Sequence, residues 1–307
     1  MKFTSIFLLI LSTRASLLPS PQSNTTADEV LPQPTQVNSP KERKHWRIPT
    51  EYAAHNSTCI LPKDTNIVPI TPNKPNAGWA MSPDQKCTSG SWCAYACRPG
   101  MVSVQWDPSV QCAAGPGCTS FNGGIKCGAN REIIKPFPNK PFCEQGLENI
   151  NIRSELDQSV SFCQTVYPGN EDMLIATVAN PHCKDQIITS PPASYWMGTS
   201  AQFYVNPAGS TAANCNWGDP KLGPFGNWAP FVFGAGQAKD GMSFASLTMN
   251  PNFPSVSIKA PLYKISLICN NCQDVNPTPC FLDPYNNDTT ACTITLPPGS
   301  QAVVLLS

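Results

Sequence analysis

The stretch FVFGAGQAKDGMSFASLTM, residues 231–249, decides the fold class because it reads as two apolar runs joined by a tight turn. Its centre, residues 237–241, contains Asp240-Gly241, and this pair accepts the positive φ angles that hairpin turns require. The flanking runs, 231–233 and 242–249, have the length and the turn-rich borders of strands. This stretch therefore predicts an antiparallel pair of strands.

Short apolar runs bounded by Pro, Gly or Asn recur through the second half of the chain. They predict further strands at 173–178, 201–205, 256–258, 262–269, 292–296 and 302–306. Only 147–166 is long enough, without Pro or Gly, to suggest a helix. The 33 prolines in 307 residues also disfavour helices. We predict an all-β fold, a disulfide-rich antiparallel β-sandwich, with a thaumatin-like sandwich as one specific form.

Charge and targeting signals limit the functions that this protein can have. The chain carries 20 basic and 20 acidic residues and no formal net charge, which argues against nucleic acid as a partner. Lys2 precedes an apolar run at 6–11, followed by small residues up to Ser16, as in a secretory signal peptide. No later run approaches the roughly 18 apolar residues of a membrane span. We expect a secreted protein that does not contact a membrane.

Three domain-level segments follow from composition. We expect a signal peptide at 1–16, a disordered Pro/Ser/Thr-rich tail at 17–55 and the folded domain at 56–307. Glycosylation sequons at Asn24, Asn56 and Asn287 agree with secretion.

Fifteen cysteines in a secreted chain indicate a disulfide framework with one cysteine left over. We expect at least five disulfides. Cys269 and Cys272 have the spacing of half a zinc site, but no second closely spaced pair of cysteines or histidines accompanies them. The sequence therefore predicts no metal and no other cofactor.

Aromatic and carboxylate side chains carry the remaining chemistry. The three histidines are poorly placed for a Ser-His-Asp hydrolase, and no zinc-protease or phosphate-binding motif occurs. Trp rings stack on the flat faces of sugars, and amides bond their hydroxyls. Several Trp residues lie in polar loops, although each could instead cover the core: Trp92, Trp106, Trp196, Trp217 and Trp228.

Several ordered blocks of the sequence form a pattern that is specific in order and composition. The blocks are CAYACRPGM at 93–101 followed by Gln105-Trp106, CQTVYPGNEDM at 163–173, TSAQFYVN at 199–206, CNWG at 215–218, GNWAP at 226–230, GAG at 234–236, Asp240-Gly241 and NPN at 250–252. Together they resemble the fungal SUN family of secreted cell-wall proteins. The resemblance implies a role in wall remodelling and cell separation, with β-1,3-glucan as the partner. It also leads us to expect location in the cell wall.

Candidate site residues follow from these blocks. For a glycosidase, two carboxylates must flank the scissile bond. Glu171 is the first candidate for the acid, and its candidate partners are Asp240, Asp172 and Asp219, each of which also suits a turn. The candidate sugar-binding residues are Trp217, Trp228, Asn227, Tyr204 and Trp106.

Three functions remain open from the sequence. The first is a weak β-glucosidase or β-1,3-glucanase. The second is a non-catalytic glucan-binding wall protein, which is favoured because Gln164-Thr165-Val166-Tyr167 lacks the Arg and Asp usual in the family. The third is a structural or effector protein on the same scaffold. Two carboxylates within about 10 Å in one groove would favour hydrolysis.

Overall fold

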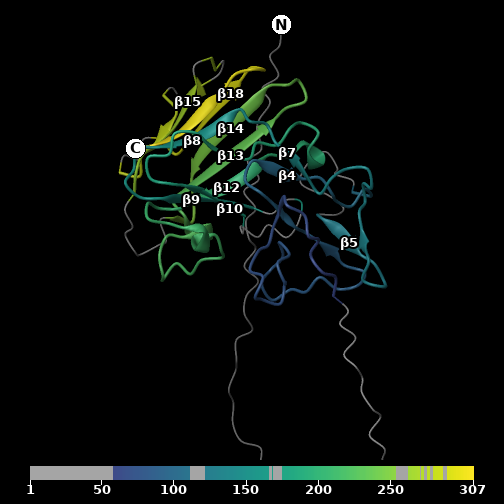
Figure 1. Cartoon of the computed structure of the whole chain (residues 1–307). Coiled ribbons are helices and arrows are strands. Elements are labelled where there is room, and N and C mark those ends of the chain that lie inside the picture. The colour runs from purple at the N-terminus through teal and green to yellow at the C-terminus, as the bar shows by residue number, and fades with distance from the viewer. Residues whose placement is uncertain are drawn as a thin grey trace, which may run out of the picture. The chain divides into compact units, whose positions relative to one another are not determined.

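A computed structural model describes residues 58–110, 122–165, 168, 175–253, 262–269, 271–272, 275–276, 279–285 and 289–307. The chain divides into two units, Met1–His55 and Asn56–Ser307, and all the described residues belong to the second. The described part consists of short strands and three single-turn 3-10 helices (Figure 1). No helix in this described part is long and apolar enough to cross a membrane.

The larger sheet has seven strands, and all its pairings are antiparallel. In spatial order they are β10 (Ile175–Ala179), β9 (Val160–Gln164), β12 (Ala201–Val205), β13 (Phe231–Gln237), β14 (Ser243–Met249), β18 (Ala291–Leu296) and β16 (Val275–Asn276). The predicted hairpin of β13 and β14 is confirmed, with Gly241 at φ +87° in its turn. Only glycine adopts this conformation without strain.

The smaller sheet has five strands and one parallel pairing, between β19 and β8. Its order is β11 (Gln186–Ile187), β8 (Ile150–Ser154), β19 (Ala302–Leu306), β15 (Ile265–Cys269) and β17 (Phe281–Leu282). Because β18 belongs to the larger sheet and β19 to the smaller one, the turn at 297–301 links the two sheets. Figure 1 shows these strands gathered in one half of the domain.

Alternating burial along the strands builds the main core. In β12, Ala201, Phe203 and Val205 are buried, while Gln202 is exposed and Tyr204 is half-buried. β19 follows the same period of two. Since successive side chains point to opposite faces, this pattern lets each sheet supply one apolar layer. Side chains from both sheets make up one cluster, which confirms the predicted β structure.

The segment before the main strands forms three small sheets with a separate core. These sheets pair β1 (Ile67–Val68) with β3 (Ala96–Cys97), β4 (Met101–Ser103) with β7 (Cys143–Gln145), and β2 (Trp92–Cys93) with β5 (Ile125–Cys127) and β6 (Ile133–Ile134). Their core contains the fully buried Trp79 and Tyr95 together with several cysteines. With strands of two or three residues, the segment depends on its disulfides.

Six disulfides join the described cysteines, as the sequence predicted. They are Cys59–Cys127, Cys87–Cys93, Cys97–Cys143, Cys163–Cys215, Cys269–Cys272 and Cys280–Cys292. Cys183 is the unbridged cysteine of the described set, and Cys112 and Cys118 lie outside it.

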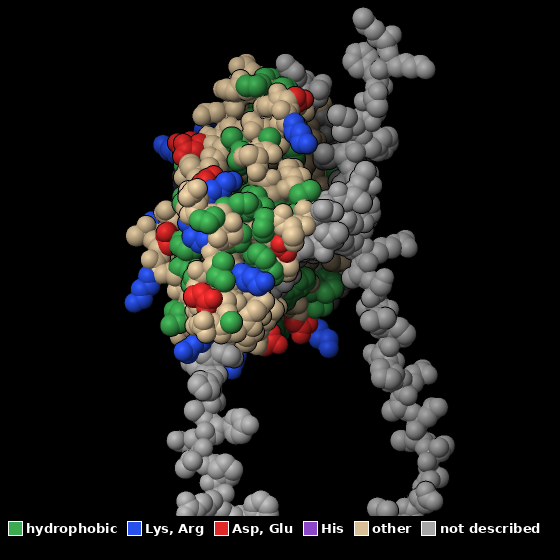
Figure 2. Space-filling view, turned by 90° about the vertical axis from the view of Figure 1, so that its right-hand side faces the viewer, with side chains coloured by type: hydrophobic (Ala, Val, Ile, Leu, Met, Phe, Trp, Pro, Cys, Tyr) green, Lys and Arg blue, Asp and Glu red, His purple; other side chains and the backbone are tan. Residues whose placement is uncertain are grey.

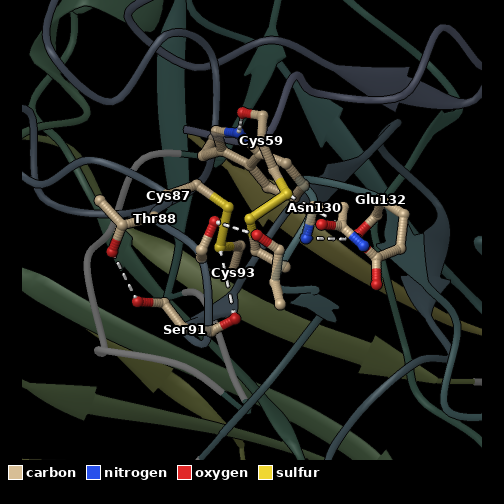
Figure 3. The surroundings of a disulfide bond; sticks show 11 residues. Cys59, Cys87, Thr88, Ser91, Cys93, Asn130 and Glu132 are labelled. Carbon is tan, nitrogen blue, oxygen red and sulfur yellow. Dashed lines mark hydrogen bonds between the residues drawn. A yellow bond between two sulfur atoms is a disulfide. The ribbon is translucent and has the colours of Figure 1, made fainter. Parts of the chain in front are cut away.

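Two of these bridges lie side by side in the small core. The sulfurs of Cys59, Cys87 and Cys127 are all within 4.8 Å of one another, and Figure 3 shows the two bridges side by side. These sulfurs are already bonded, and a metal requires thiolates. Cys269 and Cys272 are bonded to each other, so they form a bridge and not half of a zinc site.

The suggestion of a helix at 147–166 is wrong. This segment forms β8 and β9, separated by a bend near Asp157. In β8, Ile150 and Ile152 are buried while Arg153 is exposed, which is a strand period and not a helical one. Both strands pair with strands far away in the sequence, β8 with β19 and β9 with β12. These tertiary pairings, and not the length of the run without Pro or Gly, decide the secondary structure here. The predicted strand at 256–258 lies outside the described residues.

Candidate functional site

Strand register defines two ends of the larger sheet. One end, here called the Asp240 end, is the one toward which the β13–β14 turn lies, and the strand residues nearest to it are Gln164, Ile175, Ala201, Gln237 and Ser243. The strands are staggered there, because Gln164 is in register with Phe203 and Phe233, four residues before Gln237. The other end, here called the Phe231 end, carries Val160, Ala179, Val205, Phe231 and Met249. β13 has seven residues, so the two ends are about 20 Å apart.

The loop at 206–228 leaves and re-enters the sheet at the Phe231 end. It is anchored by Asn206, which is fully buried. The Asn206 amide donates to Ser161 Oγ at 2.9 Å, and its Oδ1 accepts from the Gly226 N–H at 2.8 Å. Gly226 has φ +61°, and a Cβ there would lie 1.9 Å from the Asn216 carbonyl oxygen. Only glycine leaves room for the Asn216 carbonyl oxygen at this position, so the two arms of the loop can approach each other closely.

Asn227 and Trp228 tie the CNWG and GNWAP blocks together. The Gly218 N–H donates to Asn227 Oδ1 at 2.8 Å, and Trp228 Nε1 donates to the Gly218 carbonyl at 3.0 Å. From β14, the Asn250 amide donates to the carbonyls of Asn227 and Ala229. The side-chain carbonyl of Asn227 and the indole N–H of Trp228 therefore serve to hold the loop.

A disulfide and an aromatic ring fasten the loop to the sheet. Cys215 bonds Cys163 of β9, and the ring of Tyr204 packs against this bridge on the outward face. Tyr204 is half-buried, so part of its surface stays exposed beside the bridge. These anchors give the loop the rigidity that a sugar-stacking ring requires.

Trp217 is the most exposed Trp of the described residues, with 56% of its surface accessible. It lies between the disulfide at Cys215 and the clamped Gly218, so its backbone is held on both sides. Trp106 belongs to another cluster, where it meets Phe137 edge-on at 5.2 Å and Lys140 Nζ lies 5.5 Å from its ring. The structure thus brings Trp217, Trp228, Asn227 and Tyr204 into one loop region and leaves Trp106 elsewhere.

The described candidate carboxylates serve turns at opposite ends of the sheet. Asp219 Oδ1 accepts from the Lys221 N–H at 2.9 Å in the loop, and Asp240 Oδ1 accepts from the Met242 N–H at 3.0 Å in the hairpin turn. A glycosidase pair lies about 5 to 9.5 Å apart. Because β13 separates them, Asp219 and Asp240 do not form such a pair.

Glu171 and Asp172 lie outside the described residues. The connection that carries them leaves β9 at Gln164 and enters β10 at Ile175, and both of these residues lie at the Asp240 end. In the sheet order, β9 and β13 are separated by β12 alone, which corresponds to about 10 Å across the sheet. Because Gln164 is level with Phe233, it also lies about 13 Å along the strand direction from Gln237.

Two buried tyrosines have raised pKa values because burial penalises the phenolate. Tyr263 is buried beneath the loop, donates its hydroxyl to the Asn206 carbonyl at 2.8 Å, and has a pKa well above 10. Burial likewise raises the pKa of Tyr95, whose hydroxyl donates to the Phe142 carbonyl. Both phenols are neutral at physiological pH and act as structural donors.

Asn206 and Asn250 are structural residues of the site that sequence reasoning did not single out. Both follow the end of a strand, where an amide can satisfy loop backbone groups. Their position before Pro207 and Pro251 is the signal that could have found them, because Asn-Pro favours turns.

Comparisons with known proteins identify a family and several relatives of this chain. Residues 54–295 match the family model described as Beta-glucosidase (SUN family). The probable secreted beta-glucosidase adg3 of Schizosaccharomyces pombe is 40% identical over 238 residues, which cover 76% of this chain and 21% of that protein. The uncharacterized protein YMR244W of Saccharomyces cerevisiae is 37% identical over 244 residues, covering 77% of this chain and 67% of the relative.

A third relative is the secreted beta-glucosidase SUN41 of Candida albicans, 41% identical over 172 residues that cover 54% of this chain and 39% of that protein. Against adg3 and SUN41, the chain therefore spans less than two thirds of the relative's length. No solved structure matches the chain, and the thaumatin-like form stays a prediction. Since the family model covers most of the chain, this protein belongs to the SUN family.

Proposed function

We propose that this protein is a secreted glycosidase that cleaves β-1,3-glucan of the fungal cell wall during wall remodelling and cell separation. The observation that carries the proposal is the match of residues 54–295 to a family described as beta-glucosidase. The names of adg3 and SUN41, both secreted beta-glucosidases, support secretion and the reaction class. Figure 2 supports a neutral substrate, because acidic and basic side chains are interspersed on the face it shows.

In this proposal, Glu171 is the general acid and Asp240 is its partner. The argument is topological: the connection bearing Glu171 and the turn bearing Asp240 leave the sheet at the same end, with one strand between them. By register the strand ends Gln164 and Gln237 are roughly 16 Å apart, so a pair within the 9.5 Å limit for inversion requires the two connections to approach each other beyond the strand ends. Asp219 lies at the other end of β13 and is therefore the weaker partner.

The loop at 206–228 supplies sugar binding through Trp217. Its ring is exposed on a backbone held by a disulfide and a hydrogen bond, so stacking on a sugar face requires little ordering. Such stacking contributes about 1 kcal/mol for each ring beyond simple burial. Tyr204 contributes by supporting the bridge beneath the loop.

A second candidate function is glucan binding without catalysis. It is favoured by the two described candidate carboxylates, Asp219 and Asp240, because each already accepts a backbone hydrogen bond in a turn. This function needs the Trp217 loop but neither Glu171 nor Asp240.

Product analysis with laminarin-type oligosaccharides tests both candidates. The mature protein should release shorter β-1,3-glucans, and Glu171→Gln and Asp240→Asn should each reduce the rate by at least about a hundredfold. Asp283→Asn is the matched control, because Asp283 accepts the same kind of turn hydrogen bond, from the Tyr285 N–H at 2.9 Å. It should cleave at the wild-type rate.

Other outcomes decide against specific parts of the proposal. Glucan pull-down without any cleavage would establish the second candidate. Loss of cleavage in Asp219→Asn but not in Asp240→Asn would overturn the assigned pair. A protein that neither binds nor cleaves β-1,3-glucan would exclude both functions.

A further inference from the structure

A cavity of about 400 Å³ with a mixed polar and apolar lining opens at the Asp240 end of the domain, far from the Trp217 loop. Three segments line it: 147–149 before β8, the β13–β14 turn with its flanking residues, and the turn at 297–301 between β18 and β19. Ligand pockets in proteins have volumes of about 300 to 1,000 Å³. The cavity therefore has room for a small ligand.

Backbone hydrogen bonds hold this cavity open in the absence of a ligand. The Ala238 N–H donates to the Met242 carbonyl at 2.8 Å and closes the hairpin turn. The Ala302 N–H donates to the Asn149 carbonyl at 2.9 Å and joins the other two segments. A Cβ built on Gly241 would lie 3.7 Å from Pro298 Cγ, so the two turns touch. The walls are therefore preformed.

Gln237 is part of the wall and is already occupied. Its Oε1 accepts from the Ala193 N–H at 3.3 Å, and its Nε2 donates to the Gly241 carbonyl at 3.2 Å. By contrast, within the described residues the lining side chains of Glu148, Ser300 and Gln301 make no hydrogen bond. These three side chains are available to a ligand.

The free groups match a neutral polyhydroxyl ligand. The hydroxyl of Ser300 and the amide of Gln301 can both donate and accept, and the carboxylate of Glu148 can accept from two neighbouring hydroxyls. Glu148 is the only charged side chain in the lining, and its negative charge repels phosphates and carboxylates. Prolines and Leu147 supply the apolar contacts.

We propose that this cavity, with Glu148, Ser300 and Gln301, is a binding subsite for one end of a β-1,3-glucan chain. The choice of glucan rests on the function proposed above. Gly241 lines the cavity and directly follows Asp240, so the subsite adjoins the proposed carboxylate partner. It is separate from the Trp217 loop, which joins the sheet about 20 Å away at the other end of β13.

Hydrogen–deuterium exchange with laminaritriose, a β-1,3-linked glucose trimer, tests the subsite. Binding should slow amide exchange in 147–149, 238–242 and 297–301. Glu148→Gln and Gln301→Ala should each raise the Kd for the trimer by roughly tenfold, as expected for one lost hydrogen bond to a ligand. Glu155→Gln is the matched control, because Glu155 is exposed just beyond the far end of β8. Its Kd should equal that of the wild type.

The outcomes separate this inference from the proposed function. If the wild type binds or cleaves β-1,3-glucan but these segments show no protection, or if Glu148→Gln binds normally, the subsite is wrong and the function stands. If the wild type neither binds nor cleaves β-1,3-glucan, the proposed function fails. In that case, hydrogen–deuterium exchange with cellotriose, maltotriose and chitotriose tests whether the cavity binds a saccharide at all. Protection of the three segments by any one of these trimers supports a saccharide subsite, and protection by none of them overturns it.

Discussion

At the scale of single residues, burial distinguishes the Trp side chains that hold the fold from one that is largely exposed to solvent. Trp79 is fully buried and donates its indole N–H to the Cys59 carbonyl at 3.2 Å, whereas Trp217 is 56% exposed. Trp228 lies between these cases, half-buried with its indole N–H bonded. The same residue type therefore has different roles in one chain.

Substitution of Trp217 and Trp79 should give opposite results. Trp217→Ala should weaken glucan pull-down and leave the melting temperature nearly unchanged, because little buried surface is lost. Trp79→Ala should lower the free energy of unfolding by about 3 to 5 kcal/mol. Thermal melts and pull-down on laminarin check both variants. Unfolding of Trp217→Ala, or full glucan binding by it, would remove Trp217 from the site.

Buried tyrosines make the stability fall at alkaline pH. Burial raises the pKa of Tyr263 and Tyr95 in the folded state, while an unfolded tyrosine has a pKa of about 10. Below about pH 10 both states keep the proton and the stability is intact. Above it the unfolded chain ionises first, so each tyrosine lowers the unfolding free energy by about 1.4 kcal/mol per pH unit.

The variant Tyr263→Phe isolates one of these contributions. At pH 7 it should cost about 1 kcal/mol, because the hydroxyl bond to the Asn206 carbonyl is lost. In urea unfolding measured between pH 8 and 11, the stability of the variant should follow that of the wild type up to about pH 10 and then fall less steeply, by about 1.4 kcal/mol per pH unit. A slope equal to that of the wild type would show that Tyr263 does not titrate on unfolding in this range.

At the scale of elements, the loop at 206–228 is held by one disulfide and by amide side chains from neighbouring strands. Cys163 and Cys215 are 52 residues apart in the sequence, so their bridge closes a long chain segment. Asn206 and Asn250 bind backbone groups of the loop from β12 and β14. The position of the loop depends on the sheet beneath it.

Removing the Cys163–Cys215 bridge should loosen this loop before the sheets. The double variant Cys163→Ser, Cys215→Ser should lose about 4 kcal/mol of stability by the loop-entropy relation at this separation. Amide exchange in 207–228 should accelerate more than in β13 or β14. Cys280→Ser, Cys292→Ser is the control, because its shorter separation of 12 predicts a smaller loss and no effect on the loop. Equal acceleration throughout both sheets would contradict a local role.

At the scale of the whole molecule, bridged cysteines belong to both the small core and the main core of the described residues, and Cys183 stays unbridged. Burial raises the pKa of the Cys183 thiol, which lowers its reactivity because the thiolate is the reactive form. In the native protein at pH 8, Cys183 should react with a thiol reagent several-fold more slowly than in guanidinium. Cys183→Ser should abolish this slow reaction, and a fast native reaction at Cys183 would contradict its burial.

Local chemistry made the hairpin and seven of the nineteen described strands predictable from the sequence. The Asp240-Gly241 turn and the alternation along β12 depend on neighbouring residues only, so the strand at Ala201–Val205 could be predicted to the residue. The number of cysteines in a secreted chain also predicted a disulfide framework, but it did not predict which cysteines pair.

Tertiary structure decided everything that depends on distant partners. The helix suggested at 147–166 became two strands because β19 and β12 pair with them. The separation of Asp219 from Asp240 follows from the register of β13, and the cavity at Glu148 arises where three segments remote in sequence meet. Sequence patterns report forces between neighbours, whereas register, disulfide pairing and cavities result from contacts that form only when the chain has closed on itself.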